Sequence, residues 1–135
     1  MKIVLSVLFV CLSFISFGQK DTTKQFILIV RYNVTAKPTQ EDMQTNIKHW
    51  NEFMGSLGQA GQIVSGYRPG QEGKSITGKS QTAKDGPYIA ENELISSFII
   101  IKARDFAAAE IIAKKCPIYE LGGSVEIRSL MQQAN

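Results

Sequence analysis

The chain has 135 residues and a formal net charge of +3, with 15 basic and 12 acidic side chains. This length suits a single domain. The charges form no basic stripe and no run of one sign, so we do not expect nucleic acid or an anionic membrane surface as a partner.

Residues 1–18 have the pattern of a secretory signal peptide. Lys2 gives a positive start, residues 3–17 are mostly apolar, and Ser16 and Gly18 are the small residues that a signal peptidase reads. We therefore expect cleavage before residue 19, export to the periplasm or the medium, and no stable membrane insertion afterwards. The apolar run is shorter than the roughly 18 residues that span a bilayer. The alternative is an anchor that stays attached.

The first half of the domain is predicted to be a strand followed by a helix. Residues 26–32 are apolar on both faces of an extended chain. A helix is expected after Thr39, its cap, with Asp42 at the reciprocal position of a capping box, and Gly58 and Gly61 are expected to end it. Apolar residues recur along one side of this helix at steps of three and four. They are Met43, Ile47, Trp50, Met54 and Leu57.

The middle of the chain is predicted to be extended. Residues 62–67 form a second predicted strand, and residues 74–82 form a polar hairpin arm. Residues 84–88, Lys-Asp-Gly-Pro-Tyr, are predicted to be a turn. Residues 94–103 are a predicted strand that is apolar on both faces.

The end of the chain repeats the helix and strand. A second helix is expected after Asp105, its cap, and Pro117 is expected to stop it. The buried side of this helix is predicted to consist of Ala109, Ile112, Ala113 and Cys116. Gly122 and Gly123 then turn the chain into the last predicted strand, residues 124–130.

This order of elements predicts an α+β fold. A chain of the form β-α-β-(arm)-β-α-β gives a ferredoxin-like antiparallel sheet with both helices on one face. Side chains alternate along a strand, so Phe26 and Leu28 cannot share a face with Ile27 and Ile29. One apolar face must then point away from the helices, and an apolar surface of that size is typical of an association site. We expect a homodimer whose sheets face each other.

Residues 73–80, Gly-Lys-Ser-Ile-Thr-Gly-Lys-Ser, match the phosphate-binding pattern G-x-x-x-x-G-K-[ST]. A phosphate loop needs a hydrophobic strand before it and a helix that starts at its Lys-Ser, because loop amides and the helix N-terminus hold the phosphates. Pro69 and Gly70 interrupt the segment before the motif, and residues 81–87 have no helical period. We interpret the match as two Gly-Lys-Ser turns in a polar arm, not as a nucleotide site.

Several landmarks occur in order over roughly residues 25–130. They are the strand from Phe26 to Val30, Trp50, Phe53, Gly61, Gly66, residues 84–88, Glu91, Glu93, Cys116, Pro117 and residues 123–128. Together they resemble the YCII-related domain family, in particular its branch named for an Asp-Gly-Pro-Phe motif. Tyr88 stands where that branch has Phe, and a signal peptide departs from a family that is commonly cytoplasmic. The resemblance implies a dimeric α+β barrel and, in some relatives, a small-molecule enzyme with a His-Asp acid-base pair.

His49 and Asp85 are the candidates for such a pair. His49 is the only histidine and lies at the margin of the apolar helix stripe, where a group that titrates near neutral pH could act as a general base. Its alternative role is that of an ordinary histidine at a helix boundary. Asp85 precedes Gly86 and Pro87, a turn that would aim its carboxylate. Its alternative is a turn carboxylate that bonds its own backbone.

Four residues are candidates for ligand binding. Tyr32, Trp50 and Tyr88 could line an apolar pocket, although aromatic side chains at these spacings also serve in a core. Arg31 could bind an anionic ligand, and its alternative is a salt bridge within the sheet. Arg128, on the neighbouring last strand, could pair with Glu126 or with a partner subunit.

We expect no metal, no cofactor and no nucleophilic cysteine. After signal cleavage Cys116 is the single cysteine, which excludes an internal disulfide, and a thiol at a helix C-terminus has a raised pKa. One histidine and one cysteine cannot build a zinc site, and no acidic segment has calcium-loop spacing.

Two hypotheses for function remain. The first is a small-molecule enzyme, of lyase, isomerase or dehalogenase type, in which His49 and Asp85 transfer protons and share one pocket. The second is a non-catalytic module that binds a small ligand or a partner protein, in which the two side chains have separate surroundings. The sequence favours neither and identifies no substrate.

Overall fold

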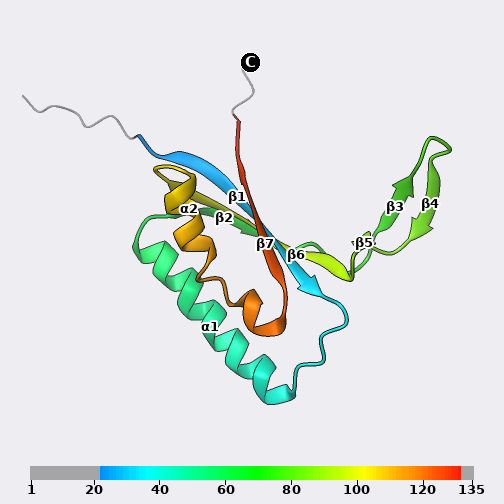
Figure 1. Ribbon diagram of the computed structural model, residues 1–135, viewed down its shortest axis with the longest axis horizontal. Coiled ribbons are helices and arrows are strands. Elements are labelled where there is room, and N and C mark those ends of the chain that lie inside the picture. The colour runs from blue at the N-terminus through cyan, green and yellow to red at the C-terminus, as the bar shows by residue number, and fades with distance from the viewer. Residues whose placement is uncertain (1–21, 132–135) are drawn as a thin grey trace, which may run out of the picture.

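The structure is a computed structural model that describes residues 22–131, so the predicted signal peptide lies outside the described residues. The strands are β1 (Lys24–Asn33), β2 (Ile63–Tyr67), β3 (Lys74–Thr77), β4 (Thr82–Asp85), β5 (Ile89–Ala90), β6 (Glu93–Ala103) and β7 (Ser124–Ser129). The helices are α1 (Gln40–Gln59), α2 (Phe106–Ala113) and a short 3-10 helix, η1 (Pro117–Leu121) (Figure 1). Among the described helices, none is long and apolar enough to cross a membrane.

The main sheet has the strand order β2-β6-β1-β7, with β5 paired to the start of β6. All neighbours are antiparallel, and Leu28 of β1 lies opposite Ile99 of β6 on one side and Ile127 of β7 on the other. Each βαβ unit therefore contributes one central and one outer strand to the sheet, as interleaved units of this type do. The predicted α+β fold is confirmed.

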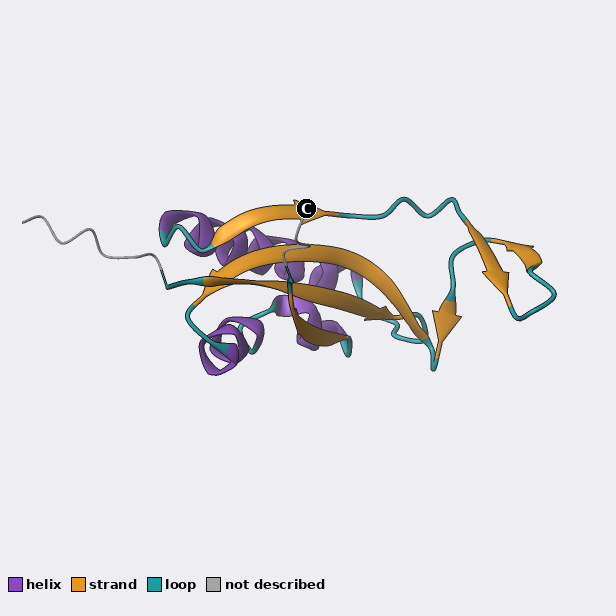
Figure 2. Ribbon diagram, turned by 90° about the horizontal axis from the view of Figure 1, so that it is seen from above, coloured by secondary structure: helices purple, strands orange, loops and turns teal. Residues whose placement is uncertain are grey.

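Both helices pack on the same face of this sheet (Figure 2). The side chains between the helices and the sheet form one core, because alternate residues of each strand point toward the helices. The core includes Phe26, Leu28, Val30, Phe53, Leu57, Ile99, Ile101, Ala109, Ile112, Ala113 and Cys116. Ala109, Ile112 and Ala113 are buried on α2 as predicted, whereas Cys116 is buried but lies after the end of the helix.

The other face of β1 and β6 is also apolar. Ile27 lies opposite Ile100, and Ile29 lies opposite Phe98, and all four side chains are only partly buried in the single chain. We call these four residues the open sheet face. The prediction that the central strands are apolar on both faces is confirmed.

The two helix starts are as predicted. The Thr39 hydroxyl accepts the N–H of Asp42, and an Asp42 carboxylate oxygen accepts the N–H of Thr39 at 2.8 Å. The Asp105 carboxylate accepts the N–H of Ala108 at 2.8 Å at the start of α2. Side chains at both caps satisfy N–H groups that have no partner within the helix.

Two predicted boundaries are wrong. Pro117 does not stop α2, which ends at Ala113; instead, Pro117 opens η1. A proline disfavours helical backbone in the residue before it, and Cys116 is extended with ψ 127°, so the helix cannot continue to Pro117. Lys84 and Asp85 pair with Ser75 and Lys74 in β4 rather than lying in a turn. The turn begins at Gly86, whose φ of 97° favours glycine.

Strands β3 and β4 form a separate two-stranded hairpin, the arm, which projects from the body of the molecule (Figures 1 and 2). Gly78, with φ 73°, and Gln81, with φ 52°, turn the chain at its tip. Residues 73–80 therefore lead into a strand and not into a helix. Of the two predicted Gly-Lys-Ser turns, the second, at Gly78, is confirmed, whereas Lys74 and Ser75 of the first lie in β3.

Candidate functional site

A cleft of about 970 Å³ lies between α1, the sheet and the base of the arm. It occupies a gap in the sheet, because β2 pairs with β6 at residues 98–101 and β5 pairs with β6 at residues 93 and 94. In the described structure, no strand covers residues 95–97 on this side of β6. The chain segments that lead into and out of the arm, residues 67–71 and 87–88, form the outer wall of the cleft.

Helix α1 supplies an apolar wall of the cleft. Met43 is 50% exposed and Ile47 is 59% exposed, although both belong to the apolar stripe of the helix. Of that stripe only Leu57 is buried in the core, while Met43, Ile47, Trp50 and Met54 all line the cleft. The stripe therefore extends past the core and leaves apolar side chains around a concave surface, which is typical of small-molecule sites.

Three of the four predicted ligand-binding residues meet in this cleft. Tyr32 comes from the end of β1, Trp50 from the middle of α1 and Tyr88 from the segment after the arm. Trp50 packs edge-on against Phe53, with ring centroids 5.8 Å apart, and this contact fixes the indole at the boundary between core and cleft. Tyr88 is 66% exposed and lies on the outer wall.

Arg31, the fourth predicted residue, lies outside the cleft. Its guanidinium donates to Glu126 at 2.5 Å, and Arg128 donates to the other carboxylate oxygen of Glu126 at 3.3 Å. These bonds, with the one from Arg31 as the larger cause, lower the pKa of Glu126. The predicted pair of Arg128 and Glu126 is confirmed, and Arg31 makes the salt bridge that was its alternative role.

His49 is bonded to η1. Its Nδ1 lies 2.8 Å from Oε1 of Glu120, and because a carboxylate only accepts, this nitrogen is the donor. The other oxygen of Glu120 accepts from Asn46 Nδ2 at 2.9 Å, and Asn46 also donates to the carbonyl of Pro117 at 2.8 Å. Asn46 is 4% exposed, so this network is partly buried and holds α1 against η1.

Asp85 is bonded within the arm. It lies at the end of β4, and its carboxylate accepts from Lys74 Nζ at 2.5 Å across the hairpin. The arm projects away from α1 in both views (Figures 1 and 2). Within the described chain, His49 and Asp85 thus have different partners on different elements, and neither lines the cleft.

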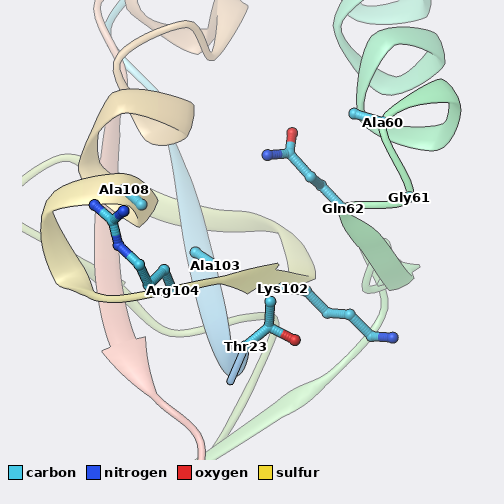
Figure 3. A pocket seen from close by; sticks show the side chains of 8 residues that line it. All are labelled: Thr23, Ala60, Gly61, Gln62, Lys102, Ala103, Arg104 and Ala108. Atoms are coloured by element: carbon cyan, nitrogen blue, oxygen red, sulfur yellow. The ribbon is translucent and has the colours of Figure 1, made fainter. Parts of the chain in front are cut away.

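A second cavity, of about 550 Å³, lies where α1 ends, β6 ends and α2 begins (Figure 3). Two cationic residues line it, Lys102 and Arg104, but their side chains extend in different directions. Arg104 also donates to Asp105 at 3.1 Å. This cavity lacks the converging polar groups that a binding site uses.

Cys116 is 2% exposed in the core, and burial raises the pKa of its thiol to about 11. The direction agrees with the prediction, but burial and not the helix end is the cause, since α2 ends before this residue. Within residues 22–131, no three His, Cys, Asp or Glu side chains are placed to hold a metal ion.

The cleft residues that sequence reasoning missed include Asn46 and Arg68. The sequence contains a pattern that could have identified Asn46, because it is a polar residue between Met43 and Trp50 on an apolar helix face. No sequence pattern could have identified Arg68. It lies at the cleft only because β2 ends at Tyr67 and the chain then leads into the arm.

Comparison with models of protein families matches residues 25–133 to the YCII-related domain. A search among curated proteins finds no match.

Proposed function

The chain belongs to the YCII-related domain family, and from this premise we propose that it is a non-catalytic module that binds a small, largely apolar ligand in the cleft beside α1. We further assign it to the Asp-Gly-Pro-Phe branch. The segment Asp85-Gly86-Pro87-Tyr88 supports this assignment, with an aromatic residue in the last position.

One observation carries the proposal: exposed apolar side chains of α1 surround a cleft of about 970 Å³. Ligand sites of soluble proteins are concave, mostly apolar and typically about 300–1,000 Å³ in volume. The exposed Met43 and Ile47 side chains and the half-buried Trp50 leave apolar surface in water, and a bound apolar molecule covers it. The cleft is therefore suited to an aromatic or branched aliphatic molecule.

The surroundings of His49 and Asp85 support binding rather than proton transfer. An acid-base pair acts within hydrogen-bond reach of the same substrate or through one water molecule. In the single chain His49 bonds Glu120 and Asp85 bonds Lys74, and the cleft is lined by neither. His49 has a sufficient structural role in the contact between α1 and η1.

We propose that the module is an exported homodimer. The open sheet face supports the dimer, because two such faces packed together exclude water from Ile27, Ile29, Phe98 and Ile100 and form an α+β barrel. The signal-peptide pattern of residues 1–18 supports export. The partners of the protein are then a second copy of itself and a small molecule.

The experiment uses Trp50, the single tryptophan of the chain, as the reporter. Titration of the mature protein with 4-nitrobenzyl alcohol, a neutral aromatic quencher, should reduce Trp50 fluorescence along a saturable curve. For a ligand of this size we expect a Kd on the order of 100 µM. Quenching that stays linear with concentration, as for free tryptophan in solution, would contradict the proposal.

Gly66→Leu is the variant that should abolish binding. Gly66 lines the cleft, and a Cβ at this position would meet Met54 Cε at 3.7 Å, an ordinary contact, so we expect the leucine side chain to occupy part of the cleft. Gly55→Leu is the matched control, because a Cβ there meets nothing within 4 Å on the exposed side of α1. Saturable quenching should disappear in the first variant and persist in the second.

A further inference from the structure

We infer that the ligand of the cleft is a small carboxylic acid with an aromatic or branched apolar body, and that Arg68 binds its carboxylate. This inference rests on the proposed function, since it names the ligand class of the same cleft. It makes Arg68 the residue that decides which small molecules are accepted.

Arg68 is the only charged side chain that lines the cleft in the described structure. The other arginines of the chain, Arg31, Arg104 and Arg128, each bond a carboxylate of the protein. Within residues 22–131, Arg68 has neither an ion pair nor a side-chain hydrogen bond. An exposed cation without a counter-ion in the described chain therefore lines a cleft whose other lining residues are largely apolar.

The chain holds Arg68 at one wall of the cleft. Arg68 follows Tyr67, the last residue of β2, and precedes Pro69, which restricts its backbone to extended conformations. Tyr67, Pro69 and Gly70 line the cleft beside it. Trp50 of α1 lines the same cleft as Arg68, so we infer that a ligand contacts Trp50 with its ring while its charged end meets the guanidinium.

The charge balance selects a monoanion. A guanidinium binds a planar carboxylate through two parallel N–H···O bonds, and this pairing matches in both charge and shape. A phosphate monoester carries about −1.5 to −2 charges at neutral pH, of which a single arginine leaves part uncompensated. A cationic ligand would have no counter-ion, because no Asp or Glu lines the described cleft.

The test compares three probes that share one ring: 4-nitrobenzoate, 4-nitrobenzyl alcohol and 4-nitrophenyl phosphate. In titrations of Trp50 fluorescence, wild-type protein should bind the carboxylate about tenfold more tightly than the alcohol, as expected for one charge-assisted pair at a partly solvated site. Arg68→Met should remove this preference, so that both probes bind with the same affinity, and Arg68→Lys should keep only part of it.

Arg104→Met is the matched control, because Arg104 lines the other cavity and not the cleft. It should keep the full preference for the carboxylate. If the wild type binds the carboxylate and the alcohol equally, the inference is overturned while the proposed function stands. Tighter binding of the phosphate would overturn the assignment to carboxylic acids. If no probe gives a saturable curve, the proposed function fails together with the inference.

Discussion

At the scale of single residues, the role of a side chain depends more on the group that it contacts than on the type of amino acid. His49 was identified as the only histidine of the chain, but its partner, Glu120, is 71 positions away in the sequence. Asp85 was expected to be aimed by a turn, but it lies in a strand and pairs with Lys74. Contacts of this range depend on how α1, η1 and the arm are placed, so no local pattern predicts them.

We predict that His49→Gln and Asp85→Asn each change the Kd for 4-nitrobenzoate by less than about twofold, because substitutions that share no contact with the ligand act independently of it. Fluorescence titration of Trp50 measures this directly. His49→Gln should also lower thermal stability slightly, since it weakens the contact with Glu120. A tenfold loss of affinity in either variant would instead support an acid-base pair that shares the ligand site.

The candidate site was only partly predictable from residue types. Tyr32, Trp50 and Tyr88 were found because aromatic residues are common in binding sites and at core boundaries, and all three line the cleft. The spacing of Met43 and Ile47 identified an apolar stripe, but it does not show whether a residue of the stripe is buried in the core or lines the cleft. Which of the two applies depends on where β2 ends, and the sequence does not predict that boundary.

At the scale of elements, the helix starts were predictable and the helix end was not. The caps are hydrogen bonds between a side chain and an N–H group no more than three residues away, so the sequence alone predicts them. They involve Thr39, Asp42 and Asp105. The end of α2 was predicted at Pro117, but the helix stops at Ala113, and Pro117 restricts only the residue before it, Cys116. The arm was predicted from its polar composition, but the extension of β4 to Asp85 follows from its pairing with β3.

Asp105 gives a prediction about acid stability. The N–H of Ala108, with Arg104 as the smaller cause, lowers the pKa of Asp105 below its ordinary value of 3.8. The unfolded chain therefore takes up this proton first as the pH falls, so the stabilisation is complete above about pH 4 and is lost as the pH drops through the lowered pKa. We expect thermal unfolding followed by circular dichroism to show this loss between neutral pH and pH 3.

Asp105→Asn is the variant that isolates this effect. Asparagine also caps a helix but has no carboxyl group to protonate. The variant should lose less stability than the wild type between neutral pH and pH 3, although other carboxylates still titrate. An identical decrease in melting temperature for both proteins would show that the cap at Asp105 does not contribute to the pH dependence.

At the scale of the whole molecule, the topology was predictable because each strand carries its two faces in its own sequence. The alternation in residues 26–30 predicted both the core face and the open sheet face, and the structure has both. The cleft was not predictable in the same way. It arises because β2 and β5 pair with separate parts of β6, and those registers include an irregularity after Ile63.

The open sheet face predicts the oligomeric state. Wild-type protein should sediment as a dimer, whereas Ile100→Glu should weaken dimerisation on the order of a hundredfold or more, because a charge buried between two sheets has no partner. Ile111→Glu is the control, since Ile111 is 60% exposed on α2 and lies outside the main sheet. It should remain a dimer. A wild type that sediments as a monomer at high concentration would contradict this assignment.

The most direct test of ligand binding in the cleft is a map of amide and indole NMR shifts during titration of the mature protein with 4-nitrobenzyl alcohol. The largest changes should fall on the Trp50 indole, on the cleft-lining residues of α1 between Met43 and Met54, on residues 66–71 and on residues 94–97. Shifts that centre on Ile27 and Ile100, or on Lys102 and Arg104, would place the ligand elsewhere and contradict the account, as would the absence of any saturable shift.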